Sequence, residues 1–404
     1  MDGSRASTSA ATTHTGSLYL LALGTFAVGT EGFMIAGILP RIADDLAVTP
    51  TAIGQLVTVF AFAYALSSPI LTALSGHMKR RTVLIGAMSI FVTTNLFAAA
   101  APGYGWLMAA RVVLAFSAGV YTPGANALAG ALVPPERRGF AIAIINAGLT
   151  VAIALGVPLG TVVATASSWR MTFVGVAVLS TIALTGLVVG LPKDIGAHLP
   201  VATLRERLNV ARRREVLLTL LVTTLWATGA YTMYTYLALF LRTTTGLHGA
   251  QVGYILLVWG VSAGAGVLFS GKLVDRRGAR AVVVPALLLG ALSFVVLSGV
   301  AHLVPMAYAL IPVILAVIVW GSTHWGFYPG QQSRLMGIAG LHLAPIALSL
   351  NASFMYLGFS LGAGVGSLIV LSSGTANLGW GAAAFELAAA SLMAWISRHE
   401  HSRT

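Results

Sequence analysis

Three charged residues lie well inside long apolar segments of this 404-residue chain, namely Glu31, Arg111 and Glu386. A charge at the depth of a bilayer is costly unless it is paired or faces water, so each is a candidate functional group. Glu31 is a candidate for a carboxyl group that takes up and releases a proton, and the alternative is a structural carboxylate buried against Arg111. The two roles are compatible, because an ion pair that opens and closes is a switch. Arg111 has parallel alternatives, a part in coupling or a structural salt bridge.

Aromatic side chains with polar tips gather in two other apolar segments. One segment carries Trp226, Tyr231 and Tyr234, and the other carries His324 among tryptophans. Such side chains suit a flat, amphipathic ligand. The alternatives are an aromatic belt at a membrane interface for the tryptophans and tyrosines, and a hydrogen-bonded packing role for the histidine. Asn146 is an uncharged polar residue in a further apolar segment, and helix–helix contact is its ordinary role.

The composition indicates a polytopic α-helical membrane protein. Hydrophobic residues make up 57% of the chain and charged residues 8%, with a mean hydropathy of +0.88. A soluble domain carries about 25% charged residues. The net charge of +12 does not indicate a nucleic-acid partner, because the basic residues sit in short loops between apolar segments. The chain has no cysteine, which excludes disulfides and thiol chemistry.

Apolar runs bounded by charge, proline or glycine predict twelve membrane-spanning helices in two halves of six. We expect a disordered cytoplasmic tail at 1–17, an N-terminal half at 18–191, a basic linker at 192–214, a C-terminal half at 215–397 and a second cytoplasmic tail at 398–404. The predicted spans are 18–40, 51–74, 82–101, 105–132, 139–166, 171–191, 215–241, 249–273, 280–301, 304–328, 342–371 and 378–397.

The distribution of basic residues predicts the orientation. With this set of spans, nineteen of the 23 Lys and Arg residues fall on one side and three on the other, with Arg111 inside a span. An excess of positive charge marks the cytoplasmic side, so both termini should be cytoplasmic. The linker segment RERLNVARRRE fits either a basic helix on the membrane surface or a solvated linker.

The loop after the eighth span has a spacing that resembles a known signature. Gly271, Asp275 and Gly278 follow the pattern GxxxDxxG, accompanied by Arg276 and Arg280. This loop resembles the signature loop of the major facilitator superfamily. We expect Gly271 to let helices approach, Asp275 to cap the next helix and pair with arginine, and Gly278 to make a tight turn. The equivalent loop after the second span has Gly76 in place of the Asp, so only the C-terminal half should carry an Asp latch.

The fifth span reinforces this resemblance. Gly148 is followed by Gly156, Pro158 and Gly160, which look like the Gly/Pro-rich stretch of proton-coupled antiporters. Small residues permit close helix crossing and the proline bends the helix, although simple packing also explains the glycines. The first span, GTEGFMIAGILP, is similar to the bacterial branch of the superfamily that exports chloramphenicol, arabinose-type sugars and purines.

The resemblance implies alternating access about a site between the halves. It places Glu31 and Arg111 in proton coupling, and the conformational switch in Gly271, Asp275, Arg276, Gly278, Arg280, Gly156, Pro158 and Gly160. It implies that the seventh and tenth helices line the cavity, so that Trp226, Tyr231, Tyr234 and His324 are expected to bind substrate. Asn146 of the fifth span is a further candidate for substrate binding. The twelfth helix is usually peripheral in this fold. We therefore expect Glu386 to face lipid or to be packed in neutral form at an interface, and Glu386→Gln to be tolerated.

We therefore expect a proton-coupled exporter of a small molecule, such as an amphenicol, a sugar or a nucleoside. An importer or facilitator of the same fold is the alternative. The expected partners are the substrate, protons and the bilayer of a bacterial inner membrane, with a monomeric protein and no nucleic acid. The sequence has no phosphate loop, no nucleophile elbow and no cluster with metal-ligand spacing, so we expect neither an enzyme, nor a cofactor, nor a metal site.

Overall fold

The computed structural model describes residues 3–75, 78–133, 138–192, 203–340 and 343–401. In these ranges the regular secondary structure is helical, with no strand. Twelve helices among the described residues are long and apolar enough to cross a membrane. The fold class predicted from the sequence, an all-α protein with twelve transmembrane helices, is therefore confirmed.

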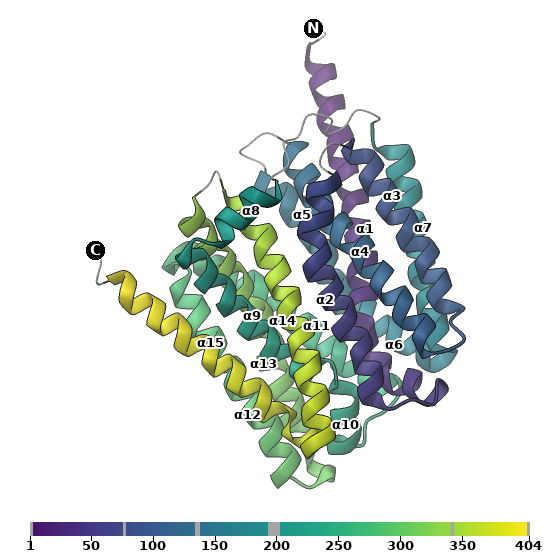
Figure 1. The fold of residues 1–404 in the computed structure, drawn as a ribbon, viewed down its shortest axis with the longest axis vertical. Coiled ribbons are helices and arrows are strands. Elements are labelled where there is room, and N and C mark those ends of the chain that lie inside the picture. The colour runs from purple at the N-terminus through teal and green to yellow at the C-terminus, as the bar shows by residue number, and fades with distance from the viewer. Residues whose placement is uncertain (1–2, 76–77, 134–137, 193–202, 341–342, 402–404) are drawn as a thin grey trace.

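The N-terminal half contributes six spans, the fifth of which is built from three consecutive segments (Figure 1). They are α1 (Gly3–Asp45), α2 (Pro50–Leu74), α3 (Arg80–Ala99), α4 (Tyr104–Ala131), the fifth span α5 (Arg138–Val151) with the π-helical η3 (Ala152–Gly156) and α6 (Val157–Ala166), and α7 (Trp169–Gly190).

The C-terminal half follows a short linker helix, α8 (Leu204–Ala211). Its six spans are α9 (Arg214–Tyr234) continued by α10 (Leu237–Thr245), α11 (Ala250–Arg277), α12 (Arg280–Leu303), α13 (Met306–Ala339), α14 (Ala344–Ser373) and, after the short η4 (Thr375–Asn377), α15 (Leu378–His401).

The two halves lie side by side, with α8 at the end of the bundle that carries the N-terminus (Figure 1). We call this the termini end and the other the opposite end. The most extensive contacts between the halves are α2 with α14 and the fifth span with α11, and α1 also contacts α10 and α11. At the first, Ser360 Oγ donates a hydrogen bond to the carbonyl of Thr58 at 3.0 Å. At the second, a Cβ added to Gly260 would lie 2.5 Å from Ala154 Cα, so the backbones touch.

Several boundaries differ from the sequence-based prediction. Residues 3–17, expected to be disordered, form the first turns of α1, and α13 continues to Ala339 rather than ending at 328. Most of the predicted linker, 193–202, lies outside the described residues. The described part contains α8, whose Thr203 and Glu206 form a reciprocal N-terminal capping box. The hydrogen bonds from Thr203 hold the pKa of the Glu206 carboxyl below its usual range.

A proline accounts for the irregular fifth span. Pro158 lacks the N–H that would donate to the carbonyl four residues earlier, and its ring crowds that carbonyl. The chain adopts the π-helical segment η3 immediately before α6. The seventh span also breaks, at Thr235 and Tyr236, without glycine or proline. There the Tyr236 hydroxyl donates to the Ala363 carbonyl at 3.3 Å and occupies the space left by Gly54.

The α9–α14 contact depends on glycines at every fourth position. Gly358, Gly362 and Gly366 of α14 face the backbone carbonyls of Thr224, Thr228 and Thr232 of α9. Added Cβ atoms would lie 2.4–2.7 Å from these oxygens, closer than any real side chain tolerates. This spacing allows the two helices to pack backbone against backbone.

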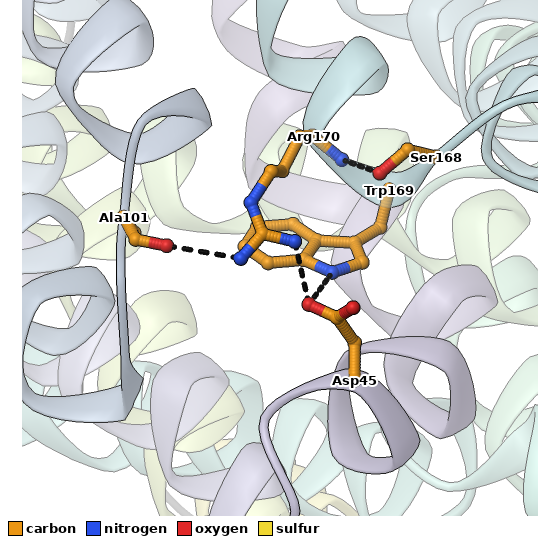
Figure 2. Close-up of polar contacts among 5 residues, drawn as sticks. All are labelled: Asp45, Ala101, Ser168, Trp169 and Arg170. Carbon is orange, nitrogen blue, oxygen red and sulfur yellow. Dashed lines mark hydrogen bonds and ion pairs between the residues drawn. The ribbon is translucent and has the colours of Figure 1, made fainter.

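At the opposite end, a polar cluster ties the N-terminal half together (Figure 2). Asp45 Oδ2, at the end of α1, accepts from Trp169 Nε1 at 3.0 Å and from Arg170 Nη1 at 2.5 Å. Arg170 also donates to the carbonyl of Ala101, in the connection between α3 and α4, at 3.1 Å. The cluster therefore links α1, α7 and the α3–α4 connection.

Candidate functional site

Glu31 and Arg111 form a buried ion pair in the N-terminal half. Arg111 Nη1, on α4, donates to Glu31 Oε1 on α1, and both side chains are 0% exposed. Arg111 also donates from Nε to the carbonyl of Leu56 on α2 at 3.3 Å. Its guanidinium stands 4.1 Å from the centre of the Phe60 ring. Two helices, α1 and α2, thus hold the arginine in place by a charge, a carbonyl and an aromatic face.

The pair is not fully satisfied. Within the described residues, Glu31 Oε2 and Arg111 Nη2 have no hydrogen-bond partner. Tyr231 on α9 and Tyr356 on α14 lie within electrostatic range of the guanidinium. A carboxylate with a free oxygen at this depth can accept a proton, and the guanidinium keeps a free donor toward the C-terminal half.

An aromatic cluster lies directly beside the pair and spans both halves. Phe33, two residues after Glu31, has ring centres 6.2–6.3 Å from Tyr231, Tyr234, Trp325 and Phe359. Tyr234 also donates from its hydroxyl to the Phe33 carbonyl at 3.3 Å. We define the aromatic cluster as Phe33, Trp226, Tyr231, Tyr234, Trp259, Trp320, His324, Trp325 and Phe359. It connects α1 to α9, α11, α13 and α14.

His324 lies between two indole rings of this cluster. Its ring is stacked on Trp226 at 4.2 Å and lies 6.3 Å from Trp259. In the described part of the chain, His324 Nδ1 and the indole Nε1 atoms of Trp226, Trp259, Trp320 and Trp325 have no hydrogen-bond partner, although all five side chains are buried. Buried polar groups in native proteins are nearly always hydrogen-bonded, so this concentration of unpartnered polar atoms makes the cluster a candidate ligand site.

Four of the five predicted substrate-binding residues belong to this cluster, and one does not. Trp226, Tyr231, Tyr234 and His324 converge, whereas the side chain of Asn146 is exposed on α5. Asn146 lies outside the cluster, and its part in substrate binding stays a prediction. The sequence analysis did not identify Phe33, Trp259 or Tyr356. The position of Phe33, close to Glu31 in the first span, was the available signal.

Glu386 is packed rather than lipid-facing. Its side chain is 2% exposed and points from α15 into the C-terminal half, against Gly229 on α9 and Gly290 on α12. Of the two placements that the sequence left open, the structure shows the interface. The carboxyl nevertheless belongs to the interior of the half, immediately behind the helix that carries Trp226.

A cavity of about 760 Å³ opens at the opposite end, between the ends of α1, α6 and α7 in one half and α10 and α11 in the other. It is polar at its rim. Arg41 in its wall donates to the Ala164 carbonyl at 3.0 Å. Within the described residues, no group of three or more His, Asp or Glu side chains is placed to hold a metal ion.

The loop between α11 and α12 departs from expectation at two of its residues. Gly278 has φ of +80° and makes the expected turn. Gly271, however, has open space where its side chain would be, so helices do not approach there. Asp275 lies inside α11, and the residue at the start of α12 is Ala279, so the expected cap is not formed. Asp275 makes no ion pair with any described residue, and Arg276 and Arg280 are exposed.

The glycines of the fifth span vary in how closely they meet α1. Added Cβ atoms at Gly148 and Gly156 would lie 2.3 Å from the Ala22 carbonyl and 2.1 Å from Thr30 Oγ1. At Gly160 the nearest atom, Met34 Cβ, is at an ordinary 3.5 Å. Close helix crossing thus occurs at the first two glycines. Gly76, in the loop after the second span, lies outside the described residues.

A model of the family described as Major Facilitator Superfamily matches residues 21–363. The chain belongs to this superfamily. It is a multi-pass membrane protein and a transporter of small molecules. Its relatives and its fold are those of transporters rather than enzymes.

Relatives of the superfamily cover almost the whole chain. The chain is 35% identical over 367 residues to the "Uncharacterized MFS-type transporter YbcL" of Bacillus subtilis, covering 91% of this chain and 92% of the relative. It is 32% identical over 369 residues to a "Chloramphenicol resistance protein" of Streptomyces lividans, covering 90% and 91%. It is also 31% identical over 363 residues to the "Inner membrane transport protein YdhP" of Escherichia coli, covering 90% of each.

Solved structures of the superfamily have the same fold at low sequence identity. A peptide transporter crystallised with alafosfalin superposes with a TM-score of 0.77 at 13% identity, covering 95% of each chain. The nucleoside transporter NupG superposes with a TM-score of 0.74 at 14% identity, covering 94% of this chain and 99% of that one.

Proposed function

We propose that this superfamily member exports a small, neutral, amphipathic molecule in exchange for protons. The observation that carries the proposal is the buried Glu31–Arg111 pair, which adjoins a cluster of aromatic side chains drawn from both halves. A titratable group beside a ligand site allows proton binding and substrate binding to influence each other. In this proposal the termini end is cytoplasmic, and the membrane is the bacterial inner membrane.

Protonation of Glu31 would weaken its ion pair with Arg111. The guanidinium would then be free to turn toward Tyr231 and Tyr356, which belong to the other half. An exchange of partners across the boundary between halves biases one arrangement of the halves over the other. The contacts that join the halves here lie in the middle of the bundle and at the opposite end, as at Gly253, whose added Cβ would be 3.6 Å from Thr161 Cβ. We propose that the described conformation faces the cytoplasm, with the cavity at the opposite end lying on the outer side of these contacts.

The chemistry of the cluster favours a flat substrate that carries hydrogen-bond acceptors. Stacked rings offer apolar faces, and the four free indole N–H groups donate but cannot accept. A carbonyl, nitro or hydroxyl oxygen on an aromatic ring would satisfy them. An amphenicol fits this description, and the name of the Streptomyces relative supports it. Sugars and nucleosides come next, since they offer oxygen acceptors with less apolar surface.

The test has two steps. Growth inhibition by a panel of antibiotics, sugars and nucleosides is compared in an efflux-deleted host that expresses wild type or Glu31→Gln. The compound identified is then followed in inverted vesicles with an imposed pH gradient. Accumulation driven by the gradient supports export, whereas movement down its own gradient alone would indicate a facilitator. Accumulation only when the gradient is reversed would indicate an importer.

A further inference from the structure

Glu386 is a buried acid to which the proposed transport cycle gives no role. Its carboxyl group lies in a notch made by two glycines on neighbouring helices. An added Cβ at Gly229 of α9 would lie 3.3 Å from Glu386 Cγ, and one at Gly290 of α12 would lie 3.7 Å from its Cδ. A side chain at Gly229 would press on the Ala382 carbonyl and on the glutamate stem, whereas Gly290 is in ordinary van der Waals contact with the carboxyl. The two glycines thus leave room for the Glu386 side chain between α9 and α12.

The notch offers the carboxyl no opposite charge. Within the described residues, Glu386 Oε2 has no hydrogen-bond partner, and no charged group interacts electrostatically with the carboxyl. The hydroxyls nearby are already used, because Thr323 Oγ1 donates to the Val319 carbonyl at 2.7 Å and Ser293 Oγ to the Gly290 carbonyl at 2.6 Å. An unpaired carboxylate at this depth is strongly disfavoured. In the described conformation Glu386 therefore holds a proton.

Among the described residues, the helices around the notch present no titratable side chain to it. α9 and α12 present their glycines, and α13 presents Thr323. The titratable groups of α9, α13 and α14 in the membrane lie elsewhere, in or beside the aromatic cluster: Tyr231, Tyr234, His324, Tyr328 and Tyr356. The proton on Glu386 can thus be exchanged only if the helices move and admit water.

Two of these helices also carry the aromatic cluster. Trp226 is one turn from Gly229 on α9, and His324 follows Thr323 on α13. A ligand that separates the stacked rings of Trp226 and His324 would move α9, which forms one wall of the notch, and α13, which presents Thr323 to it. Loading of the cluster and access to the carboxyl are therefore mechanically linked.

We propose that Glu386 is a second proton-binding site, loaded in the conformation described here and unloaded when the C-terminal half rearranges. The inference rests on the proposed function, in which the halves alternate between two arrangements. It adds a proton-carrying group in the half that lacks the Glu31–Arg111 pair. One cycle would then move a proton at each of two separate places.

The experiment uses infrared difference spectroscopy on protein in liposomes, without substrate. A protonated carboxyl gives a C=O stretching band that disappears on ionisation. We expect a band that titrates with pH in wild type, persists in Glu31→Gln and is lost in Glu386→Gln, with Glu206→Gln on exposed α8 as the matched control. If Glu386→Gln does not fold, Glu386→Asp should shift the band instead. Because no transport is measured and the Glu31 band is separate, this result does not depend on that of the proposed function.

A disulfide lock links the titration to the conformational change. Thr161 Cβ and the position of a Cβ on Gly253 are 3.6 Å apart across the halves, within the range of about 3.5–4.5 Å for a disulfide. The chain has no cysteine of its own. In oxidised Thr161→Cys/Gly253→Cys, the Glu386 band should persist to alkaline pH, and reduction should restore titration. A band that titrates equally in the locked protein, or in neither form, would show a carboxyl with no part in the cycle and overturn the proposal.

Discussion

Glu31 and Arg111 have a structural and a functional role that substitution can separate. Glu31→Gln leaves a buried arginine without its counter-charge, which costs about 3–5 kcal/mol. We expect a lower unfolding temperature in detergent and loss of pH-driven transport in liposomes. The protein should still insert into the membrane, because one uncharged side chain makes the first span more apolar.

The double variant Glu31→Gln/Arg111→Gln is the control for this prediction. It removes both charges, so most of the lost stability should return while transport stays absent. Full pH-driven transport by Glu31→Gln would exclude the proton role and leave the pair as a structural ion pair only.

Trp226 allows a prediction about the free indole N–H groups. Trp226→Phe keeps an aromatic ring on His324 and removes the donor, whose hydrogen bond to substrate is worth about 0.5–1.5 kcal/mol. We expect the Kd of the compound identified by the growth panel to rise roughly 2- to 10-fold, with stability nearly unchanged. Trp380→Phe, at a site 44% exposed, is the matched control. Equal affinities for both variants and wild type would show that the Trp226 indole does not donate to the substrate.

At the level of single residues, the sequence showed which side chains are charged but not which way they point. Glu31 and Arg111 were recognisable because a charge in an apolar segment needs a partner, and the pair is observed. Asn146 lies outside the aromatic cluster, on an exposed face of its helix, and the sequence could not show which face that would be. Glu386 could be placed on a helix, but the inward rotation of that helix depends on Gly229 and Gly290, which are far away in the chain.

At the level of helices, the spans were predictable and their interruptions were not. Hydrophobic length identifies a helix because the bilayer imposes that length. The π segment before Pro158 has a local cause that a sequence can display. The break at Thr235 and Tyr236 has no local cause in the sequence, since it depends on the Tyr236 hydrogen bond to α14. The predicted end of α13 was too early because its last turns are amphipathic rather than uniformly apolar.

The α9–α14 contact gives a prediction with a control on the same helix. Gly362→Ala would place its Cβ 2.4 Å from the Thr228 carbonyl, whereas nothing lies within 4 Å of a Cβ at Gly364. Overpacking of this kind costs about 1–3 kcal/mol. We expect Gly362→Ala to lower the unfolding temperature in detergent and Gly364→Ala to leave it unchanged or raise it. Equal effects would mean that the helices can separate without cost.

At the level of the whole molecule, substitution of Asp275 tests whether this residue stabilises one arrangement of the two halves. Asp275 makes no ion pair with a described residue in this conformation, so a latch through Asp275 would act in the other arrangement, with the opposite end open. Asp275→Asn should then depopulate that arrangement. A latch worth about 1–3 kcal/mol corresponds to a shift of roughly 5- to 150-fold.

The measurement is the labelling rate of a cysteine at Gly253, which is buried where α11 meets the fifth span. Asp275→Asn should slow labelling of Gly253→Cys at least 5-fold on this estimate. The Lys272→Gln substitution, one turn earlier on α11, is the control, and its rate should not change. An unchanged labelling rate for Asp275→Asn would mean that the GxxxDxxG motif makes a turn and does not act as a latch.

The neutrality of the Glu31–Arg111 pair also has an electrical meaning. While paired, the two side chains contribute no net charge within the bilayer, so a transmembrane voltage exerts no force on them. A proton on Glu31 leaves Arg111 as one positive charge, on which the voltage acts with about 2.3 kcal/mol per 100 mV for a full crossing. A pH jump on a solid-supported membrane should produce a smaller transient current in Glu31→Gln than in wild type, because only the proposed proton site at Glu386 remains in that variant. With the cell interior negative, the voltage would drive the protonated protein toward the cytoplasm-facing state and leave the deprotonated protein free to return.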